Sequence, residues 1–458
     1  MYKIDFNRPI SVYFVGIGGI SMSGLAELLI AKGFKVSGSD MQESPLTEAL
    51  RAKGAIICCP QKKENIKDGI DLAVYTAAIR EDNPELMEIH GRNIPTLSRS
   101  ELLGQVMDNY SDSLAVAGTH GKTTTTGMLS HILLSASLDP TISIGGILPS
   151  IQGNFRVGKS PCFLTEACEY KNSFLDFRPK VGVILNVEAD HLDFFKDIDD
   201  IRRSFRRFAE NIRAAGTLII HNNIAGYPEI TDGLPCRVVH FGLDDTASYH
   251  AENISYDNGL PRFDLYNGDK MLGQLELHVP GGHNIENAIA ATAAADAMGI
   301  DTAHILEGLG SFKGTGRRFE HKGQWKGIDI IDDYAHHPTE IKATLEAARK
   351  SAKGKIWCVF QPHTYSRTKA LLDNFADALK SADEVIVADI YAAREKDPGD
   401  IHSRDLKDAI IEKGGHAHYF PSFKEIIIFL SEQCIHGDML ITMGAGDIYK
   451  VGDELLSL

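Results

Sequence analysis

The residues of this sequence best suited to chemistry lie at positions 118–124, Gly118-Thr119-His120-Gly121-Lys122-Thr123-Thr124. An apolar run at 114–116 precedes them, and apolar residues at helical spacing follow from Met128. Strand, glycine loop, Lys-Thr and helix in this order are typical of a phosphate-binding loop. Backbone N–H groups and the helix N-terminus attract phosphate; Lys122 can reach the β- or γ-phosphate, and the Thr123 hydroxyl can ligate Mg²⁺. Val116 stands where such loops usually have a further glycine, so an ordinary turn is the alternative.

Acidic residues follow two other apolar segments. Glu166 comes after residues 162–164, and Asn186-Val187-Glu188-Ala189-Asp190-His191-Leu192-Asp193 ends a second segment. Because ligands of open α/β sheets bind beyond the carboxyl ends of strands, we expect Glu166 to hold Mg²⁺ or Mn²⁺ with Thr123. His191 is the candidate ligand of a second cation, and an ordinary hydrogen-bonded histidine is the alternative. The spacing does not suit zinc.

A second glycine loop, Gly16-Ile17-Gly18-Gly19, lies between an apolar strand and a helical pattern that contains Ser23. Asp40 ends the next strand, 24 residues after Gly16. The pattern resembles a dinucleotide fingerprint, in which the acid contacts a ribose, although Ser21 replaces the third glycine. It predicts nucleotide-type binding; a tight turn that packs a helix on a strand is the alternative. This loop alone favours a dehydrogenase, which leaves the second phosphate loop unexplained.

A third polar segment, Gly281-Gly282-His283-Asn284-Ile285-Glu286-Asn287, opens an alanine-rich helix predicted at residues 287–298. Its amides could bind a base or a phosphate. Simple N-capping of the helix by Asn284 is the alternative.

The elements that must position these groups form three blocks. Strands alternate with helical patterns in each block, which predicts βαβ units and parallel sheets. The fold class is therefore α/β with three domains, each with a mainly parallel sheet: residues 1–108 (Rossmann-like), 109–311 (P-loop ATPase-like) and 312–458 (Rossmann-like). Polar residues 107–113 and glycine-containing residues 308–311 mark the two boundaries. The order of the strands between residues 217 and 280 stays open.

Composition excludes several classes of protein. The 458-residue chain has a net charge of −15, which argues against nucleic-acid and membrane partners. Its seven cysteines, without a C-x-x-C spacing, do not form a disulfide framework. The sequence shows neither a leader pattern nor a run of 18 apolar residues. We expect a cytoplasmic protein, either monomer or homodimer.

Taken together, the motifs resemble those of the Mur ligases of bacterial cell-wall synthesis, and among them the alanine-adding member. The resemblance covers nearly the whole chain. Besides the two glycine loops, it rests on Ser37-Gly38-Ser39-Asp40, Glu166-Ala167-Cys168-Glu169-Tyr170, Asn186-Val187-Glu188-Ala189-Asp190-His191 and Gly282-His283-Asn284. In the third block it rests on Arg317-Arg318-Phe319-Glu320, Asp332-Asp333-Tyr334-Ala335-His336-His337-Pro338, Phe360-Gln361-Pro362-His363 with Arg367-Thr368, and Gly444-Ala445-Gly446-Asp447.

The resemblance implies an ATP-dependent ligase of peptidoglycan precursor synthesis, and so a role in cell-wall biogenesis, cell shape and cell division. L-Alanine would be joined to the lactyl carboxylate of UDP-N-acetylmuramate through an acyl phosphate, giving UDP-N-acetylmuramoyl-L-alanine, ADP and phosphate. The helix at 201–208 lacks the carbamylated lysine of later family members, which suits the alanine-adding enzyme. Arg394 stands where many relatives have glycine.

The resemblance also implies a role for each candidate residue. Residues 1–108 would bind the UDP-sugar, and the other two blocks would bind ATP, with the amino acid on the third. The implied UDP-sugar-binding residues are Gly16, Gly18, Gly19, Ser23, Asp40 and His336. The implied ATP-binding residues are Gly118, Thr119, His120, Gly121, Lys122, Thr123, Thr124, Asn287, Arg318 and Asp332. The implied catalytic residues are Lys122, Glu166, His191, His337 and Arg367, with Thr123, Glu166 and His191 as metal ligands.

Three alternatives stay open. A recycling ligase would attach a ready-made tripeptide to the same nucleotide sugar, but the first glycine loop resembles that of the alanine-adding enzyme. An NAD-dependent dehydrogenase conflicts with the loop at 118–124. A P-loop switch without synthetic chemistry conflicts with Glu166 and with the string at 332–338. For His336 and His337, the alternative to a functional role is that they are simply two polar residues ahead of a proline-capped helix.

Overall fold

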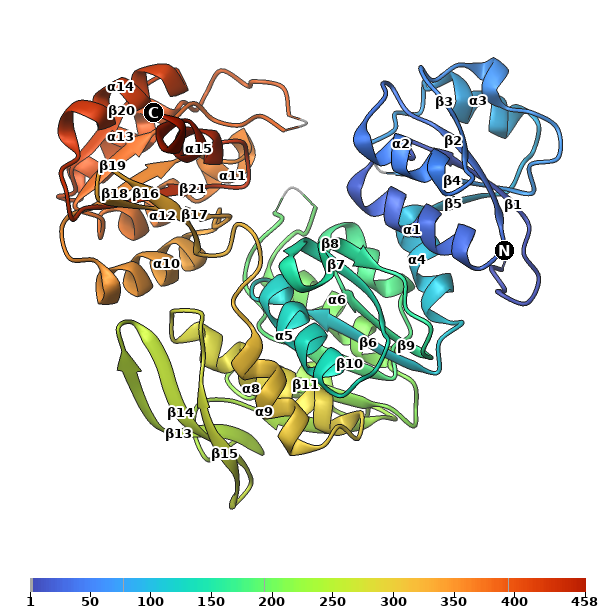
Figure 1. Ribbon diagram of the computed structural model, residues 1–458, viewed down its shortest axis with the longest axis horizontal. Coiled ribbons are helices and arrows are strands. Elements are labelled where there is room, and N and C mark those ends of the chain that lie inside the picture. Colours follow the sequence, from blue (N-terminus) through green and yellow to red (C-terminus); the bar gives the residue numbers. More distant parts are fainter. Residues whose placement is uncertain (1–2, 77, 193, 394) are drawn as a thin grey trace. The chain divides into compact units, whose positions relative to one another are not determined.

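The computed structural model describes residues 3–76, 78–192, 194–393 and 395–458, so Asp193 and Arg394 lie outside the described residues. Figure 1 shows three sheets with helices packed on them. No helix in the described ranges is long and apolar enough to cross a membrane. All seven cysteines are free.

The N-terminal sheet has five parallel strands in the order β3-β2-β1-β4-β5. The strands are β1 (Ser11–Val15), β2 (Lys35–Ser39), β3 (Ile56–Cys58), β4 (Leu72–Tyr75) and β5 (Thr96–Ser98). The helices between and after them are α1 (Ile20–Ala31), α2 (Pro45–Ala52), the short 3₁₀ helix η1 (Lys63–Asn65), α3 (Pro84–Gly91) and α4 (Arg99–Met107). Strands of apolar residues buried on both faces, such as β1 and β4, produce this arrangement.

The central sheet has ten strands in the order β15-β14-β13-β12-β11-β10-β6-β9-β7-β8. The strands are β6 (Asp112–Ala117), β7 (Thr141–Leu148), β8 (Gly153–Arg156), β9 (Cys162–Glu166), β10 (Val181–Ile184), β11 (Thr217–His221), β12 (Arg237–Phe241), β13 (Tyr249–Asp257), β14 (Leu260–Asn267) and β15 (Lys270–Glu276). The helical elements are α5 (Lys122–Ser135), η2 (Pro149–Ile151), η3 (Tyr170–Asp176), α6 (Ile198–Glu210), α7 (Tyr227–Thr231), α8 (His283–Ala297) and α9 (Thr302–Ser311). Its middle strands are parallel, whereas β7–β8 and β13–β15 pair antiparallel.

The C-terminal sheet has the order β16-β17-β21-β18-β19-β20 and is parallel except for the β16–β17 hairpin. The strands are β16 (Glu320–Trp325), β17 (Ile328–Asp333), β18 (Ile356–Phe360), β19 (Glu384–Val387), β20 (Ala417–Tyr419) and β21 (Met439–Met443). The helices are α10 (Pro338–Ser351), α11 (Tyr365–Ala370), α12 (Leu372–Leu379), α13 (Ser403–Glu412), α14 (Phe423–Gln433) and α15 (Tyr449–Ser457). Two apolar clusters, one on each face, cover this sheet.

The two predicted boundaries differ in their local structure. Residues 108–111 connect α4 to β6, inside the predicted segment 107–113. Residues 308–311, in contrast, form the last turn of α9, so the irregular connection to the third sheet follows them at 312–319.

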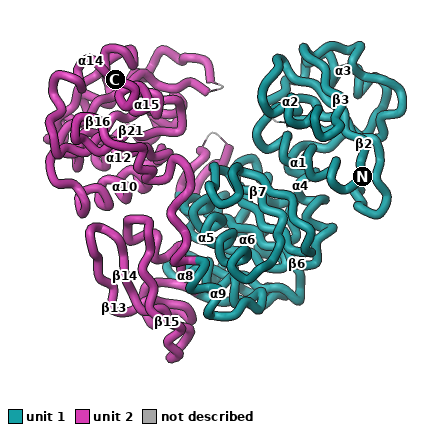
Figure 2. Tube along the Cα trace, in the orientation of Figure 1, with its two compact units in different colours: residues 1–188, 199–240, 290–308 teal, residues 189–198, 241–289, 309–458 magenta. Residues whose placement is uncertain are grey.

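The chain divides into two compact units, shown in Figure 2. Unit 1 contains residues 1–188, 199–240 and 290–308, and unit 2 contains residues 189–198, 241–289 and 309–458.

Candidate active site

The predicted phosphate-binding loop lies between β6 and α5 in unit 1. Gly121 immediately precedes α5 with a φ of 82°, and Gly118 has a φ of 142°, both in the region that favours glycine. A Cβ atom on Gly118 would stand 2.9 Å from the Cβ of Leu185. The two glycines are therefore required by the backbone path and, at Gly118, by the close approach of the chain after β10.

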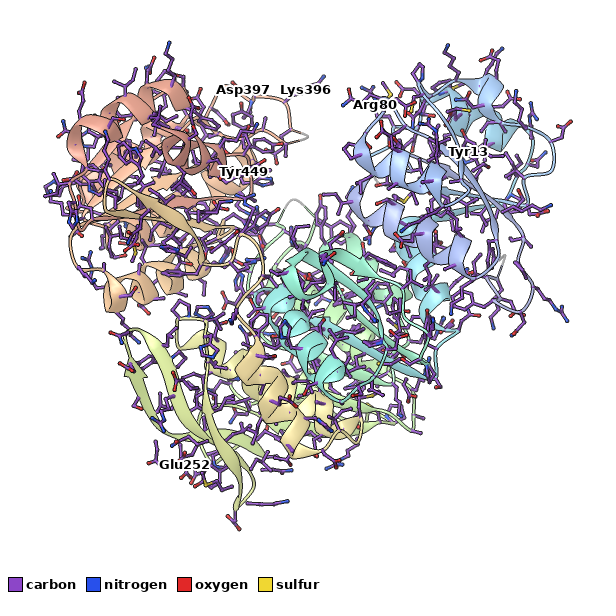
Figure 3. All side chains as sticks on the ribbon, viewed as in Figure 1. Tyr13, Arg80, Glu252, Lys396, Asp397 and Tyr449 are labelled. Atoms are coloured by element: carbon purple, nitrogen blue, oxygen red, sulfur yellow. The ribbon has the colours of Figure 1, made fainter. Side chains whose placement is uncertain are left out.

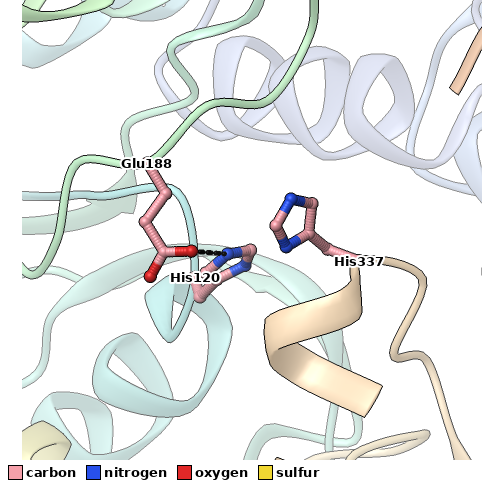
Figure 4. A group of neighbouring side chains, drawn as sticks. All are labelled: His120, Glu188 and His337. Atoms are coloured by element: carbon pink, nitrogen blue, oxygen red, sulfur yellow. Dashed lines mark ion pairs between the residues drawn. The ribbon is translucent and has the colours of Figure 1, made fainter. Parts of the chain in front are cut away.

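The segment after β10 braces this loop. The His120 N–H donates to Oδ1 of Asn186 (2.8 Å), and Nδ2 of Asn186 donates back to the His120 carbonyl (3.2 Å). The Glu188 N–H donates to the Thr119 hydroxyl (2.9 Å). Figure 4 shows the contact of His120 Nε2 with the Glu188 carboxylate, at 3.4 Å. Asn186 is thus a loop-bracing residue that sequence reasoning did not single out.

Lys122 is tied into the protein by its ammonium group. Nζ lies 2.5 Å from the Gly118 carbonyl, 3.0 Å from the Thr119 carbonyl and 3.0 Å from Oε2 of Glu169. Burial disfavours the charged form, but the Glu169 carboxylate, together with Cys168 and Glu166, outweighs the effect of burial and holds the pKa of Lys122 above its usual range. The ammonium is therefore charged, as a phosphate-binding lysine requires.

Two oxygen donors accompany the loop in unit 1. Glu166 ends β9, the strand beside β6, and its Oε1 accepts the Gly145 N–H at 2.6 Å, which orients the carboxylate. The Thr123 hydroxyl lies in the first turn of α5. Carboxylate and hydroxyl oxygens are the donors that Mg²⁺ and Mn²⁺ prefer, so these residues fit a hard divalent cation.

Asp40 contacts the first glycine loop through the backbone of the loop. Oδ2 of Asp40 accepts the Gly18 N–H at 2.7 Å, and its Oδ1 accepts the Met41 N–H at 2.8 Å. Gly16 has a φ of 84°. The buried Ser23 donates from its hydroxyl to the Ile20 carbonyl within α1. In this structure Asp40 therefore fixes the shape of the loop.

In unit 2, Asp190 joins Arg367 and His191. Oδ1 of Asp190 accepts from Nη2 (3.1 Å) and Nε (3.3 Å) of Arg367 and from the His191 N–H (2.7 Å). Burial would raise the pKa of Asp190, but these positive partners hold it well below its usual range. His191 has a φ of 54°, a left-handed backbone. Asp190 is a site residue that sequence reasoning missed as a partner of Arg367.

Two histidines lie beside Arg367. Nδ1 of His363 is 3.4 Å from Nη1 of Arg367, and the rings of His336 and His363 are 6.0 Å apart. Burial lowers the pKa of each imidazole to about 4. Both rings are therefore neutral at pH 7.

The neighbouring arginines 317 and 318 and the neighbouring aspartates 332 and 333 have different partners in the structure. Asp332 accepts from Nε of Arg317 (2.8 Å) and from the Thr442 hydroxyl (2.8 Å). Arg317 also donates to the carbonyls of Gly444 and Gly446. Its guanidinium stacks over Tyr449, labelled in Figure 3, at 4.7 Å. Asp332 is thus paired with Arg317, the neighbour of the ATP-binding candidate Arg318.

Arg318 and Asp333 form the other half of this region. The Arg318 guanidinium lies 5.2 Å from the Tyr334 ring centre. Asp333 accepts the N–H groups of Phe319 (2.9 Å) and Ala335 (2.7 Å), and burial raises its pKa to about 6. Identical neighbours in a sequence give no signal to tell which member is structural, and only the fold separates them.

The remaining candidates lie at two helix starts of unit 2. His337 is the N-cap of α10, and its Nδ1 accepts the Thr339 N–H at 3.4 Å, ahead of Pro338. Asn284 lies inside α8 and donates to the Pro280 carbonyl (2.6 Å), so the alternative of N-capping by Asn284 is wrong. Asn287 donates to Oδ1 of Asn284 at 3.0 Å. Residues 283–286 of this segment form the first turn of α8, which starts four residues earlier than the predicted 287, and Gly281 and Gly282 precede the helix.

A phosphate-binding loop on one sheet and a nucleotide-type loop on another are typical of α/β enzymes with two nucleotide sites. The chain belongs to the Mur ligase family. Residues 11–111 match the model described as "Mur ligase family, catalytic domain", residues 116–295 the "Mur ligase middle domain" and residues 317–446 the "Mur ligase, glutamate ligase domain".

Individual relatives agree with this family. The chain is 57% identical over 457 residues to the UDP-N-acetylmuramate–L-alanine ligase of Agathobacter rectalis and 54% identical over 458 residues to that of Lachnospira eligens; each match covers 100% of both chains. The solved structure of UDP-N-acetylmuramate-alanine ligase MurC from Thermotoga maritima matches with a TM-score of 0.81 and 30% identity, over 98% of each chain. A murein peptide ligase from Psychrobacter arcticus matches with a TM-score of 0.70 and 25% identity, over 98% of each chain. The predicted fold class, α/β with three mainly parallel sheets, is confirmed.

Proposed function

We propose that this protein joins L-alanine to the lactyl carboxylate of UDP-N-acetylmuramate at the expense of ATP. Curated relatives that carry this activity in their names are 50–57% identical over nearly the whole chain. The observation that carries the proposal is the loop at 118–124, with a charged Lys122 and the oriented carboxylate of Glu166 on the adjacent strand.

The chemistry explains why such a loop is needed. A carboxylate is a poor electrophile, and oxide is a poor leaving group, so a carboxylate does not react with an amine at pH 7. Transfer of the γ-phosphoryl group gives an acyl phosphate, whose carbonyl carbon the alanine amine attacks as phosphate leaves. Lys122 and the backbone N–H groups of the loop would stabilise the charge that spreads over the transferring phosphoryl group.

Thr123 and Glu166 would hold a divalent cation, Mg²⁺ or Mn²⁺, and His191 is the proposed ligand of a second one. Such a cation neutralises the charge between two anionic reactants. The part assigned to the chain itself is orientation: Gly145 fixes the Glu166 carboxylate, and the Asp190 carboxylate holds the backbone of His191.

The proposed substrate-binding roles of the other candidate residues follow the order of the three domains along the chain. The loop at Gly16, Gly18 and Gly19, fixed by Asp40 and followed by Ser23 in α1, would bind the UDP-sugar in the domain at 1–108. The domain at 109–311 would bind ATP through residues 118–124 and Asn287. From the domain at 312–458, Arg318 and Asp332 would contact ATP, while His336, His337 and Arg367 would serve the UDP-sugar and the amino acid.

For ATP, the pairing of Asp332 with Arg317 narrows this assignment. Both guanidinium groups lie over aromatic rings, but that of Arg317 also donates to the Asp332 carboxylate and to the carbonyls of Gly444 and Gly446. We therefore assign ATP contact to Arg318 and expect Asp332 to act through Arg317. ATP and a nucleotide sugar as substrates suit a cytoplasmic enzyme, and either a monomer or a homodimer would support the chemistry.

The recycling ligase is the second candidate, since a murein peptide ligase shares the fold and 25% of the sequence. The much higher identity to alanine-adding relatives favours L-alanine. A dehydrogenase has no use for the loop at 118–124.

The proposal is tested by phosphate release from ATP with UDP-N-acetylmuramate and either L-alanine or a tripeptide. We expect turnover with L-alanine alone. Without any amine, borohydride should reduce the acyl phosphate to an alcohol, and Glu166→Gln should suppress that alcohol. Release only with the tripeptide would establish the recycling enzyme, and ligation with no alcohol trapped would favour a concerted route.

A further inference from the structure

Glu169 lies three residues beyond the carboxylate that ends β9 and has no role in the reaction proposed above. Its side chain is only 3% exposed. The backbone around it is fixed: the Ala167 N–H donates to the Val116 carbonyl (2.8 Å), and the Glu169 carbonyl accepts the Asn172 N–H (2.9 Å). The fold therefore places a carboxylate permanently against the phosphate loop.

This carboxylate contacts the ammonium group that should bind phosphate. Nζ of Lys122 lies 3.0 Å from Oε2 and 3.3 Å from Oε1 of Glu169. An ammonium group has three N–H donors. The carbonyls of Gly118 and Thr119 and the Glu169 carboxylate supply three acceptors, one for each donor. A phosphate oxygen can accept a hydrogen bond from the Lys122 ammonium only when the bond to one of these three acceptors breaks.

The carboxylate is the acceptor that must yield. The two carbonyls belong to the loop that would surround the phosphates, and they carry only partial charge. Glu169 is a full negative charge in a buried position, where its repulsion of a polyphosphate is screened little by water. Lys122 has a long, flexible side chain, so it can leave Glu169 without a change in the backbone.

We propose that Glu169 is a positioning residue that holds the Lys122 ammonium in the nucleotide-free enzyme and exchanges it for the β- and γ-phosphates when ATP binds. This inference rests on the proposed function for the identity of the nucleotide. In this role Glu169 competes with the phosphates for Lys122. It keeps the Lys122 ammonium charged and in place before the nucleotide binds. It also lowers the affinity for ADP, and so favours release of this product.

The exchange has a signature that a purely structural role lacks. Phosphate-loop lysines reach the β- and γ-phosphates and not the α-phosphate. Removing the competing charge should therefore tighten the binding of ATP and ADP, while AMP, which has only the α-phosphate, should bind as before.

The test is calorimetric titration of the full-length protein with ATP, ADP and AMP in the presence of Mg²⁺. Glu169→Gln should lower the Kd of ATP and ADP about tenfold, the factor that corresponds to about 1.4 kcal/mol and to one charge-assisted hydrogen bond. The Kd of AMP should change less than twofold. Glu169→Asp keeps the charge and should stay close to the wild type.

Asp112→Asn is the matched control. It removes another lysine-paired carboxylate from the same sheet, 2.7 Å from Nζ of Lys180, at the opposite end of β6. It should leave all three Kd values unchanged. In a Lys122→Met background, Glu169→Gln should lose most of its effect on ADP, because the ammonium for which the two anions compete is gone.

Weaker binding of ATP or ADP by Glu169→Gln would overturn the proposal, and so would equal shifts for all three nucleotides or no shift. If Glu169→Gln does not fold, Glu169→Met removes the same charge with a side chain of similar length and should lower the Kd of ATP and ADP in the same way. Titration requires no ligation, so failure of the amino-acid assay would reject the proposed function while leaving these Kd values interpretable.

Discussion

Protonation of the His336 imidazole is linked to the free energy of unfolding. Nδ1 lies 3.0 Å from the Tyr334 carbonyl, and burial lowers the pKa of the ring to about 4, below its unfolded value of about 6.5. Between these two values the unfolded chain binds a proton that the native protein does not, so the free energy of unfolding falls as the pH drops from about 6.5 to about 4. Above pH 6.5 this contribution to the pH dependence disappears.

His336→Gln should flatten this part of the stability profile by up to about 3 kcal/mol. Urea unfolding at pH 7.5, 6, 5 and 4 measures this pH dependence, with His304→Gln, at a partly exposed histidine, as the control. Parallel wild-type and His336→Gln profiles would show that the ring titrates normally in the native state.

At the scale of single residues, the sequence predicts what a local motif determines. Gly118 and Gly121 could be predicted because positive φ values and close backbone approach follow from the loop motif itself. Glu169 could not be given its role, because its contact with Lys122 depends on the path of the chain after β9. The partners of Arg317 and Arg318 depend in the same way on the third sheet.

Among the elements, the packing of α9 on α5 is set by one glycine. A Cβ atom on Gly308 would stand 2.4 Å from the Cα of Ile132 and 2.6 Å from its backbone nitrogen. Backbone atoms cannot rotate aside, so Gly308→Ala must push the two helices apart. We expect a loss of about 1–3 kcal/mol in the free energy of unfolding, as for other overpacked sites.

Gly310 offers a matched control in the same helix, since a Cβ there would meet nothing within 4 Å. Gly310→Ala should leave stability unchanged or raise it by about 0.5–1 kcal/mol, because alanine favours the helix. Thermal unfolding of both variants measures the difference. Equal effects of the two substitutions would mean that helix propensity, and not the contact with α5, decides the result.

Periodicity predicted the type of most elements but not their interruptions. The apolar pattern over residues 369–380 predicts a single helix, but the structure separates α11 from α12 at Leu371, whose φ of −116° and ψ of 19° leave the helical region. One non-helical residue leaves the apolar pattern intact, so the sequence gives no signal. The antiparallel order β13–β14–β15 likewise depends on which strands pair, and strand patterns alone do not contain that information.

For the whole molecule, the central question is the division of labour between the two glycine loops. One follows β1 and the other follows β6, on different sheets of unit 1. In Gly18→Ala, the new Cβ would stand 2.8 Å from Oδ2 of Asp40 and 3.1 Å from Cγ2 of Thr47, so the carboxylate must release the Gly18 N–H. Lys122→Met/Glu169→Gln removes both charges of the buried pair at the other loop.

If the loops bind different substrates, each variant should impair the substrate of its own loop and leave the substrate of the other loop unaffected. Gly18→Ala should raise the Kd of UDP-N-acetylmuramate about tenfold, which corresponds to about 1.4 kcal/mol, and leave the Kd of ADP unchanged. Lys122→Met/Glu169→Gln should keep the affinity for the UDP-sugar and lower turnover about 10³-fold or more, since it lacks the lysine that stabilises the transferring phosphoryl group. Titration of both variants with UDP-N-acetylmuramate, ADP and NAD separates the possibilities. Tight binding of NAD that Gly18→Ala abolishes, with no response to the UDP-sugar, would assign the first loop to a dinucleotide and reject the division proposed here.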